Sequence, residues 1–425
     1  MSTKVIVTGE GAICAAGMDP DQIWEAARAG RSAIGPIQQW DSSSWPCKLA
    51  GEIVNLNPRA LLEDRKLHKI IRRTDLLGLY AAEKAIEGAG LIAHREGLDP
   101  EQADVFNDRT AVYAGTGGGA YQDQYDFFPL LTATGGDMKG FGRELDATVN
   151  PMWLLRILPN NVLCHIGIRH GFKGPNGCIT NHTISGMLAV ADAAAALRAD
   201  EASRAVAVGH DSPIEPEYIL YYHALGLLTS DTIRPFDTGR SGALLGEGAA
   251  ALVLETESAV RARGGKVLGE FLASGCVAEG EGLLSIRADG DGLARAIALA
   301  LDDAGIAAAD VGMVVAHGNG TRSSDSSEAS ALRRIFGTMP PPVTAFKWAF
   351  GHSLAASGII DCVLALNSLR RGEIPGIATL REPDPACADL PISATVQKPR
   401  SDVALVLGRG FAGTNAAVLL RAPTN

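Results

Sequence analysis

The chain lacks an apolar run long enough to cross a lipid bilayer, and it lacks paired cysteines. No segment approaches the roughly 18 uninterrupted apolar residues that a membrane span requires. The seven cysteines are scattered and form no CxxC pair, which argues against structural zinc and a disulfide framework. The first residues lead directly into a strand-like segment at 5–7, without a signal-peptide pattern. We therefore expect a cytoplasmic protein with reduced thiols and no bound metal.

An excess of positive charge is also missing. The formal net charge of −10 argues against a general affinity for nucleic acid or for an anionic membrane. A local basic cluster is nevertheless present at Lys66, Lys69, Arg72 and Arg73. This cluster could dock an acidic carrier protein, or it could be a solvated helix face, and its composition alone favours neither interpretation.

The 425 residues alternate β-branched runs with alanine-rich runs, which indicates an α/β layered fold. The length allows two domains of about 200 residues that share a core. Strands are predicted at residues 5–7, 110–113, 205–208, 249–254, 311–316, 404–407 and 416–420. Helices are predicted at residues 19–29, 75–89, 185–199, 292–304, 326–335 and 355–370. Asp19 is the expected N-cap of the first helix, with Pro20 just inside it.

Three connecting segments organise the rest of the chain. Residues 255–266 are charged and contain glycine, which indicates a junction between an N-terminal half at 1–255 and a C-terminal half at 266–425. Residues 120–148 are polar and poorly periodic, which predicts a long excursion serving as a cap or as a dimer contact. The glycine run at 115–120 formally fits a dinucleotide-binding pattern. We discount it because no helical periodicity follows.

Four motifs occur in a meaningful order along the chain. Thr183 lies in a glycine-bearing turn at 174–186 that opens an alanine-rich helix. His317 lies in the glycine-rich segment 315–321, and Lys347 precedes His352 in the segment 347–358. A final turn, Gly-Phe-Ala-Gly-Thr-Asn, contains Phe411. Together these motifs resemble those of the β-ketoacyl-ACP synthases over nearly the whole chain. The resemblance implies a thiolase-like five-layered αβαβα fold of two similar halves, usually a dimer.

The two histidines have a chemical interpretation of their own. His317 and His352 stand at glycine-rich turns that could aim imidazole N–H groups into one cavity. An enolate oxygen formed from a malonyl thioester needs such donors, each contributing on the order of 3–4 kcal/mol in a site without water. A lone histidine in such a turn is more often a satisfied polar residue, so the ordered set carries the hypothesis. The resemblance adds Lys347, which tunes the neighbouring histidine and pairs with a glutamate, a role that would fall to Glu328.

Thr183 stands where the resemblance places the reactive cysteine of the condensing enzymes. The dipole of the following helix lowers the pKa of a thiol, but an alcohol is far too basic to ionise in this way at neutral pH. The branched side chain also crowds the path of attack. We therefore expect slow or absent acyl transfer and a surviving decarboxylation of malonyl-ACP to acetyl-ACP. The substrate is then carried on the phosphopantetheine arm of an acyl carrier protein, and no separate cofactor is needed. This resembles the decarboxylases of polyketide pathways, which usually have serine here.

Three further residues are singled out near this site. Arg409 falls where condensing enzymes often have a gating phenylalanine, and it could either bind a carboxylate or face solvent. Phe411 is expected to contact the substrate near the oxyanion position. His182 occupies a position where the family usually has a small residue, and we expect it to make a structural hydrogen bond.

Two alternatives stay open. The first is a non-catalytic partner subunit, the chain-length factor of a heterodimer with a cysteine-bearing ketosynthase. Such subunits generally lose the histidines, so His317, Lys347 and His352 argue against this role. The second is retained acyl transfer, through a Thr183 oxyester or through Cys178, although Cys178 is expected to pack in the core. A homodimer is the expected state of a decarboxylase, and the choice between malonyl and methylmalonyl stays open.

Overall fold

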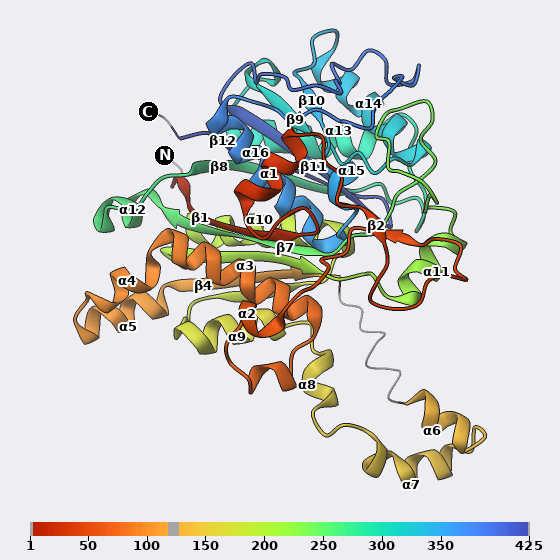
Figure 1. Ribbon diagram of the computed structural model, residues 1–425. Coiled ribbons are helices and arrows are strands. Elements are labelled where there is room, and N and C mark those ends of the chain that lie inside the picture. The colour runs from red at the N-terminus through yellow and green to blue at the C-terminus, as the bar shows by residue number, and fades with distance from the viewer. Residues whose placement is uncertain (1–2, 118–126, 424–425) are drawn as a thin grey trace.

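The computed structural model describes residues 3–117 and 127–423 (Figure 1). Its core is one mixed ten-stranded sheet in the order β10-β9-β11-β12-β8-β1-β7-β6-β4-β5. The N-terminal half contributes β1 (Val5–Cys14), β4 (Thr110–Thr116), β5 (Asn176–Ile179), β6 (Arg204–Asp211) and β7 (Gly248–Thr256). The C-terminal half contributes β8 (Gly269–Ala278), β9 (Met313–Val315), β10 (Val343–Thr344), β11 (Val403–Gly410) and β12 (Thr414–Arg421). A separate two-stranded sheet pairs β2 (Gly35–Pro36) with β3 (Leu49–Ala50).

The two halves repeat one topology. When the strands of each half are numbered in chain order, both halves have the same spatial order. From the outer edge of the sheet to its centre, this order is third, second, fourth, fifth and first. The halves meet where β1 pairs antiparallel with β8, with Val5 opposite Phe271 and Val7 opposite Gly269. The chain passes from one half to the other through α12 (Glu257–Arg263). This repetition confirms the predicted construction from two similar halves.

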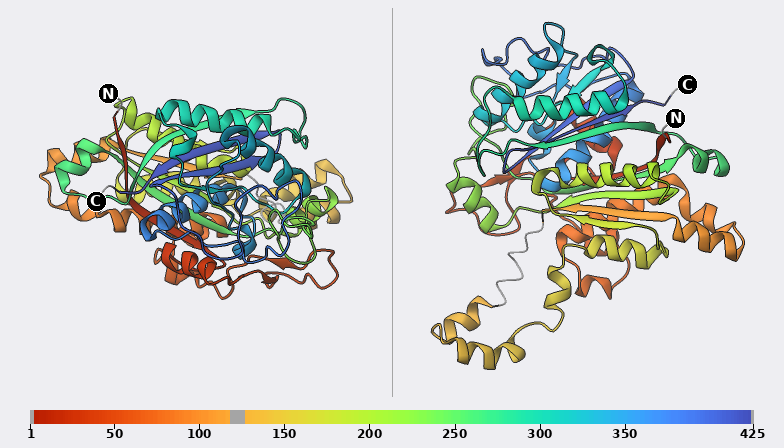
Figure 2. Two further views of the ribbon diagram at one scale, coloured as in Figure 1. Left: turned by 90° about the horizontal axis from the view of Figure 1, so that it is seen from above. Right: turned by 180° about the vertical axis from the view of Figure 1, so that it is seen from behind.

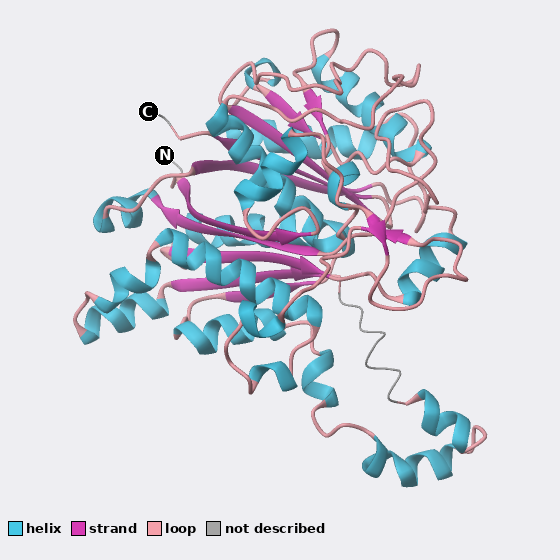
Figure 3. Ribbon diagram, in the orientation of Figure 1, coloured by secondary structure: helices cyan, strands magenta, loops and turns pink. Residues whose placement is uncertain are grey.

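The two halves of the sheet form two layers, and helices form the other three layers (Figure 3). The buried middle layer contains α10 (Ser185–Arg198), which packs on β4 and β6, and α16 (Ser357–Arg371), which packs on β11 and β7. One outer layer contains α3 (Arg73–Ala89) and α9 (Asn161–His170), and the other contains α13 (Asp291–Ala304) and α14 (Arg322–Phe336). The resulting order of helix, sheet, helix, sheet and helix is the predicted thiolase-like fold.

The remaining helices connect these layers. They are α1 (Pro20–Arg28), α2 (Pro58–Leu61), α4 (Leu91–Glu96), α5 (Pro100–Asp108), α11 (Pro216–Ala224) and α15 (Lys347–Phe350). Short 3-10 helices are η1 (Leu67–Lys69), η3 (His182–Ile184), η4 (Ala308–Asp310) and η5 (Leu354–Ala356). Within the described ranges, no helix is both long enough and apolar enough to span a bilayer.

Small residues let the middle layer pack tightly. A Cβ atom on Gly186 would lie 2.5 Å from the carbonyl oxygen of Ala355, and one on Gly209 would lie 2.9 Å from the Cα atom of Gly186. Only glycine allows backbones to approach this closely. The approach brings the beginning of α10 against η5, so the first turns of the two central helices meet in the middle of the molecule.

Every predicted strand and helix has a counterpart in the structure, but several elements were missed. The side chain of Asp19 accepts from the N–H of Gln22 and caps α1, as predicted, with Pro20 at the first helical position. In the ten-stranded sheet, the strands β8 and β10 were not predicted. The strand β8 contains glycine, serine and alanine instead of a β-branched run, and it is held by pairing to β1 and β12. Tertiary pairing therefore outweighs its weak local propensity.

The excursion predicted at residues 120–148 begins outside the described residues, and its described part, 127–148, is largely helical. It contains α6 (Phe128–Ala133) and α7 (Met138–Thr148), followed by α8 (Trp153–Ile157), and this segment projects from the body (Figures 1 and 2). Asp137 caps α7 by accepting from the N–H groups of Lys139 and Gly140. The glycine run at 115–120 extends beyond residue 117 and so lies partly outside the described residues. A role as a cap or as a dimer contact stays a prediction.

Candidate active site

The candidate site lies where the first turns of the two central helices meet. In each half a 3-10 turn, η3 or η5, leads into the central helix. His182 and Leu354 begin these turns with positive φ angles of 48° and 42°. The fold therefore builds the same turn twice, and the two copies face each other.

Matching serines stabilise both turns. The Ser185 hydroxyl accepts from the N–H of Asn181 at 2.8 Å, and the Ser357 hydroxyl accepts from the N–H of Ser353 at 3.0 Å. Each serine is the first residue of its central helix, so it satisfies a backbone donor at the helix entrance. The copies differ in the side chains that they present, with Thr183 in the first turn.

A cavity of about 200 Å³ opens beside these turns. Five of the seven predicted site residues line it: Thr183, His317, His352, Arg409 and Phe411. Apolar side chains complete much of the wall: Leu225, Leu227, Leu245, Leu283, Leu284 and Ile286. Lys347 and Glu328 are buried and stand behind this wall instead of in it. The fold thus brings together residues that lie far apart in the sequence.

The two predicted imidazoles, His317 and His352, make the same kind of hydrogen bond to the backbone. The ring centres of His317 and His352 are 5.2 Å apart, with the planes at 73°. The Nδ1 atom of His317 accepts from the N–H of Arg409 at 3.4 Å, and the Nδ1 atom of His352 accepts from the N–H of Leu354 at 3.1 Å. The proton of each neutral ring is therefore on Nε2. Among the described residues neither Nε2 atom has a partner, so both are available as donors to a ligand.

Both imidazoles are held neutral. Burial lowers the pKa of His317 and of His352 well below 6.5, and the positive charge of Lys347 lowers both further. Two neutral N–H donors in a low-dielectric cavity, with a buried ammonium behind them, can stabilise an oxygen that becomes negative.

The buried lysine has a partner that the sequence did not reveal. Lys347 Nζ lies 3.1 Å from Asp361 Oδ2, and both side chains are 1% exposed. The expected pairing of Lys347 with Glu328 is wrong, because the oxygens of Glu328 accept from the backbone N–H groups of His317 and Gly318 at 2.8 and 3.0 Å. Glu328 thus fixes the turn that carries His317. The sequence did offer a signal for this role of Asp361, because it is a carboxylate in the otherwise apolar first half of α16.

Arg409 is buried, so the alternative in which it faces solvent is wrong. Its guanidinium donates to the carbonyl oxygen of Ser324 at 3.1 Å and to Glu279 at 3.2 Å. Burial lowers its pKa, while the nearby carboxylates oppose that effect. Glu279, which sequence reasoning missed, therefore pairs with the guanidinium that was a candidate to bind a substrate carboxylate.

His182 connects Thr183 to a residue of α11. The Nδ1 atom of His182 is 2.9 Å from Thr183 Oγ1, and its Nε2 atom is 2.8 Å from the hydroxyl of Tyr222. The ring of Phe411 stacks on the imidazole at 4.8 Å. Burial lowers the pKa of His182 to about 4. His182 thus makes two side-chain hydrogen bonds where one was expected. Tyr222 lines the cavity, and the sequence did not single it out.

Cys178 is not part of the cavity wall. It lies on β5, paired with Ala114 of β4, and burial raises the pKa of its thiol. A thiol with a raised pKa is a poor nucleophile at neutral pH. Within the described part of the chain, no group of three histidine, cysteine or carboxylate side chains could hold a metal ion.

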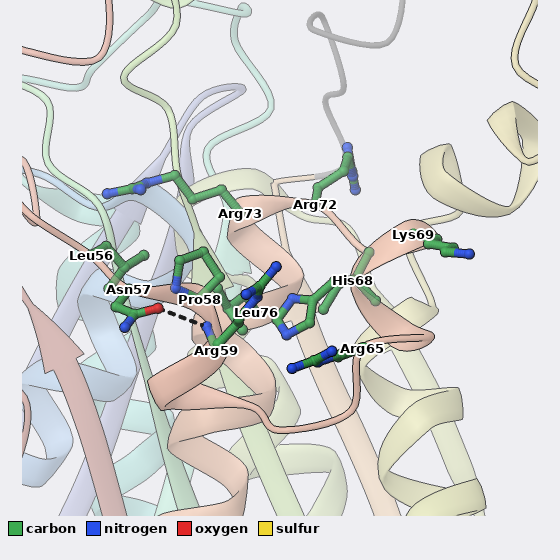
Figure 4. Close-up of a pocket in the computed structure, with 11 residues that line it drawn as sticks. Leu56, Asn57, Pro58, Arg59, Arg65, His68, Lys69, Arg72, Arg73 and Leu76 are labelled. Atoms are coloured by element: carbon green, nitrogen blue, oxygen red, sulfur yellow. Dashed lines mark hydrogen bonds between the residues drawn. The ribbon is translucent and has the colours of Figure 1, made fainter.

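A second hollow, which we call the basic hollow, has a volume of about 710 Å³ (Figure 4). Five cationic side chains line it: Arg59, Arg65, Lys69, Arg72 and Arg73. Of the predicted basic cluster, Arg73 forms an ion pair with buried Glu247 at 2.6 Å, and Arg72 forms one with buried Asp75 at 3.6 Å. Both arginines therefore have structural partners. Lys69 is exposed in the hollow, and Lys66 is exposed outside it.

Comparison with known proteins supports the family that the motifs indicated. The model of the β-ketoacyl synthase N-terminal domain matches residues 2–259, and that of the C-terminal domain matches residues 268–381. The chain is 30% identical to nodulation protein E of Rhizobium sp. (strain N33), over 99% of this chain and 100% of that protein. It is also 30% identical to 3-oxoacyl-[acyl-carrier-protein] synthase 2 of Staphylococcus aureus (strain N315), over 98% of both chains.

A solved structure agrees with these relatives. The ishigamide ketosynthase/chain length factor superposes with a TM-score of 0.86 at 27% identity, and the match covers 100% of both chains. The domain models, the relatives and the repeated topology all lead to one conclusion: the chain belongs to the β-ketoacyl synthase family.

Proposed function

We propose that this protein removes the carboxylate of a malonyl group carried on an acyl carrier protein and releases acetyl-ACP. The observation that supports this most strongly is the pair of neutral imidazoles, His317 and His352, with free Nε2–H groups beside Thr183. Such a pair serves a reaction in which an oxygen gains negative charge. A threonine in the place of a thiol provides no ready acceptor for an acyl chain.

The reaction needs few groups. The malonyl thioester enters from the mouth of the cavity, and its thioester oxygen takes hydrogen bonds from His317 and His352. The bond to the carboxylate breaks, carbon dioxide leaves, and the electron pair forms an enolate that the two N–H groups stabilise. Burial lowers the pKa of both imidazoles, and Lys347, which is held by Asp361, lowers it further and contributes a positive potential. The enolate carbon then takes a proton, because no acyl group is present for it to attack.

The size of the cavity supports a short acyl group. Its volume of about 200 Å³ is below the roughly 300–1,000 Å³ of pockets for larger ligands. Leucine and isoleucine side chains form part of the wall and offer a carboxylate no partner, while residues such as Asn319 and Thr414 make the rest of the wall polar. Arg409 is not a free partner for a carboxylate, because its guanidinium is held by Glu279.

The second candidate is a non-catalytic partner subunit. The full-length likeness to a structure of a ketosynthase/chain length factor favours it. A purely structural subunit, however, has no need of two aligned N–H donors. Oligomeric state separates the two roles, since a partner subunit should purify with a cysteine-bearing ketosynthase and the decarboxylase should purify as a homodimer.

Incubation of the pure protein with malonyl-ACP tests the proposal directly. Mass spectrometry of the carrier should show the loss of one carbon dioxide per malonyl group, with acetyl-ACP as the product. Mass spectrometry of the protein itself should show no covalent acyl group. An unchanged carrier would reject the decarboxylase, and an acyl adduct on Thr183 would support retained acyl transfer.

We infer that the acyl carrier protein docks at the basic hollow. Replacing Lys69 with glutamate should lower kcat/KM for malonyl-ACP by about tenfold, because an acidic carrier is steered by positive charge. The rate with malonyl on a short pantetheine arm should not change, since no carrier is involved. The matched control is Arg261→Glu on α12, whose side chain is 77% exposed outside the hollow. Equal effects of the two reversals would place the carrier elsewhere.

A further inference from the structure

Three side chains form a continuous hydrogen-bonded row at the edge of the cavity. The Tyr222 hydroxyl is 2.8 Å from His182 Nε2, and His182 Nδ1 is 2.9 Å from Thr183 Oγ1. All three residues line the cavity. A neutral imidazole has one N–H donor and one acceptor nitrogen, so it can accept a proton from one hydroxyl and donate its own to the other. The row therefore has the connectivity of a proton relay.

The backbone conformation of His182 does not by itself indicate a proton relay. Its φ angle of 48° is matched by the 42° of Leu354 in the other half, so the strained turn belongs to the repeated fold. The side chain is what differs, because leucine offers no hydrogen-bonding group at the corresponding position. The row of hydrogen bonds is thus a property of the side chains in the first half.

The row is shielded by aromatic rings. Phe411 stacks on the imidazole of His182 with a centroid distance of 4.8 Å, and it lies 5.6 Å from the ring of Tyr222. Burial lowers the pKa of His182 to about 4, so the imidazole is neutral at physiological pH. An imidazole that is neutral and bonded at both nitrogens passes a proton on instead of storing it.

The proposed reaction needs a proton donor besides the oxyanion donors. His317 and His352 are neutral, and loss of an N–H proton from either would leave an imidazolate anion next to the substrate. Thr183, a buried residue close to the turn at Gly410, offers a hydroxyl in the same cavity. It can donate only if its oxygen is reprotonated as it does so, and His182 Nδ1 is the group in position.

We propose that Tyr222, His182 and Thr183 relay the proton that converts the enolate into the acetyl group, an inference that rests on the proposed decarboxylation. A C–H bond forms at the enolate carbon as the Thr183 O–H bond breaks. Thr183 Oγ1 takes the proton from His182 Nδ1, and His182 Nε2 takes the proton from the Tyr222 hydroxyl. Water entering the cavity, which Tyr222 lines, returns a proton to the Tyr222 oxygen. The net change is consumption of one proton from solvent for each carbon dioxide released.

The test measures the decarboxylation of malonyl-ACP in mixtures of H₂O and D₂O. For the wild-type protein the rate should fall with deuterium content along a curve, because several protons move together. Tyr222→Phe removes only the hydroxyl and should lower the rate by about 100-fold, as loss of acid–base assistance does. Its residual rate should vary linearly with deuterium content, because one proton then moves. Tyr221→Phe, on the same helix and 55% exposed, is the matched control and should behave as wild type.

The outcomes separate the relay from the reaction. A wild-type protein that releases no carbon dioxide overturns both proposals. A wild-type protein that is active, with Tyr222→Phe equally fast and equally curved, overturns the relay alone. A purely structural effect of Tyr222→Phe would lower the rate but leave the curvature unchanged, which also overturns the relay.

A spectroscopic measurement does not depend on activity. In protein labelled with ¹⁵N-histidine, the signal that disappears in His182→Asn should show a protonated Nδ1 and an accepting Nε2. The relay requires this tautomer, because the proton must face Thr183 before transfer. Observation of the opposite tautomer, with the proton on Nε2, would overturn the proposed direction.

Discussion

Replacing His317 with alanine is expected to lower the rate of carbon dioxide release from malonyl-ACP by about 10²–10³-fold, which is the usual cost of one oxyanion donor. The Nε2–H group of His317 is free in the cavity, while its Nδ1 atom and its backbone N–H are both bonded to the protein. The ring therefore has one donor for the enolate, and alanine removes it. His352→Ala should have a similar effect, because the same geometry is built on the other side.

Two measurements distinguish a lost donor from a lost structure. His317→Asn retains an N–H donor and should recover part of the activity, whereas His223→Ala removes an exposed histidine of α11 and should change nothing.

Because burial lowers the pKa of both site imidazoles, His317 and His352 would be protonated only at a pH well below the ordinary histidine value. The wild-type rate should therefore be level between about pH 6 and pH 8 with respect to these groups. A bell centred on the ordinary histidine value would contradict neutral donors.

Thr183→Cys is expected to create a covalent acyl intermediate that the wild-type protein does not form. Position 183 lies at the entrance of α10, where the partial positive charge of the helix stabilises a thiolate. A cysteine there would be a far better nucleophile than the threonine hydroxyl. After incubation with acyl-ACP, the variant should gain about one acyl group per chain by mass spectrometry. Supplied with malonyl-ACP as well, it should release some β-ketoacyl-ACP.

The control for this gain is a chain in which Cys178 is replaced by serine, because Cys178 is the nearest thiol in the sequence. The adduct should persist in Thr183→Cys with Cys178→Ser and should be absent from Cys178→Ser alone. Thr183→Ser should stay free of acyl groups, because the hydroxyl remains too basic. A Thr183→Cys protein that binds acyl-ACP without forming an adduct would show that position 183 does not stand in the path of an acyl thioester.

The core elements and the two halves could be predicted because their signals are local. Apolar and alanine-rich runs indicate strands and helices directly, and Asp19 before Pro20 marks a helix start. The strand β8 could not be predicted in this way, because pairing on both sides holds a sequence with weak strand propensity. The helices α6 and α7 were missed because α6 (Phe128–Ala133) has only six residues, too few to show an apolar period, and α7 (Met138–Thr148) contains two glycines, which are unfavourable within a helix.

The candidate site also combines features that the sequence predicted with features that only the folded structure determined. The types and order of Thr183, His317, Lys347 and His352 were enough to predict the family, and they suggested the chemistry that we propose. The partner of Lys347 was not predictable, because Asp361 and Glu328 are both carboxylates at plausible distances along the chain and only packing selects between them.

The amino-acid sequence alone determined the fold class, the family and the two imidazoles proposed to face the substrate. The tertiary structure decided which nitrogen of each ring carries its proton, because backbone N–H groups from Arg409 and Leu354 occupy the Nδ1 atoms. It also decided that His182 connects Thr183 to Tyr222, since the turn that places this imidazole depends on the meeting of two central helices. Such relations depend on distances across the fold, and residue order does not contain them.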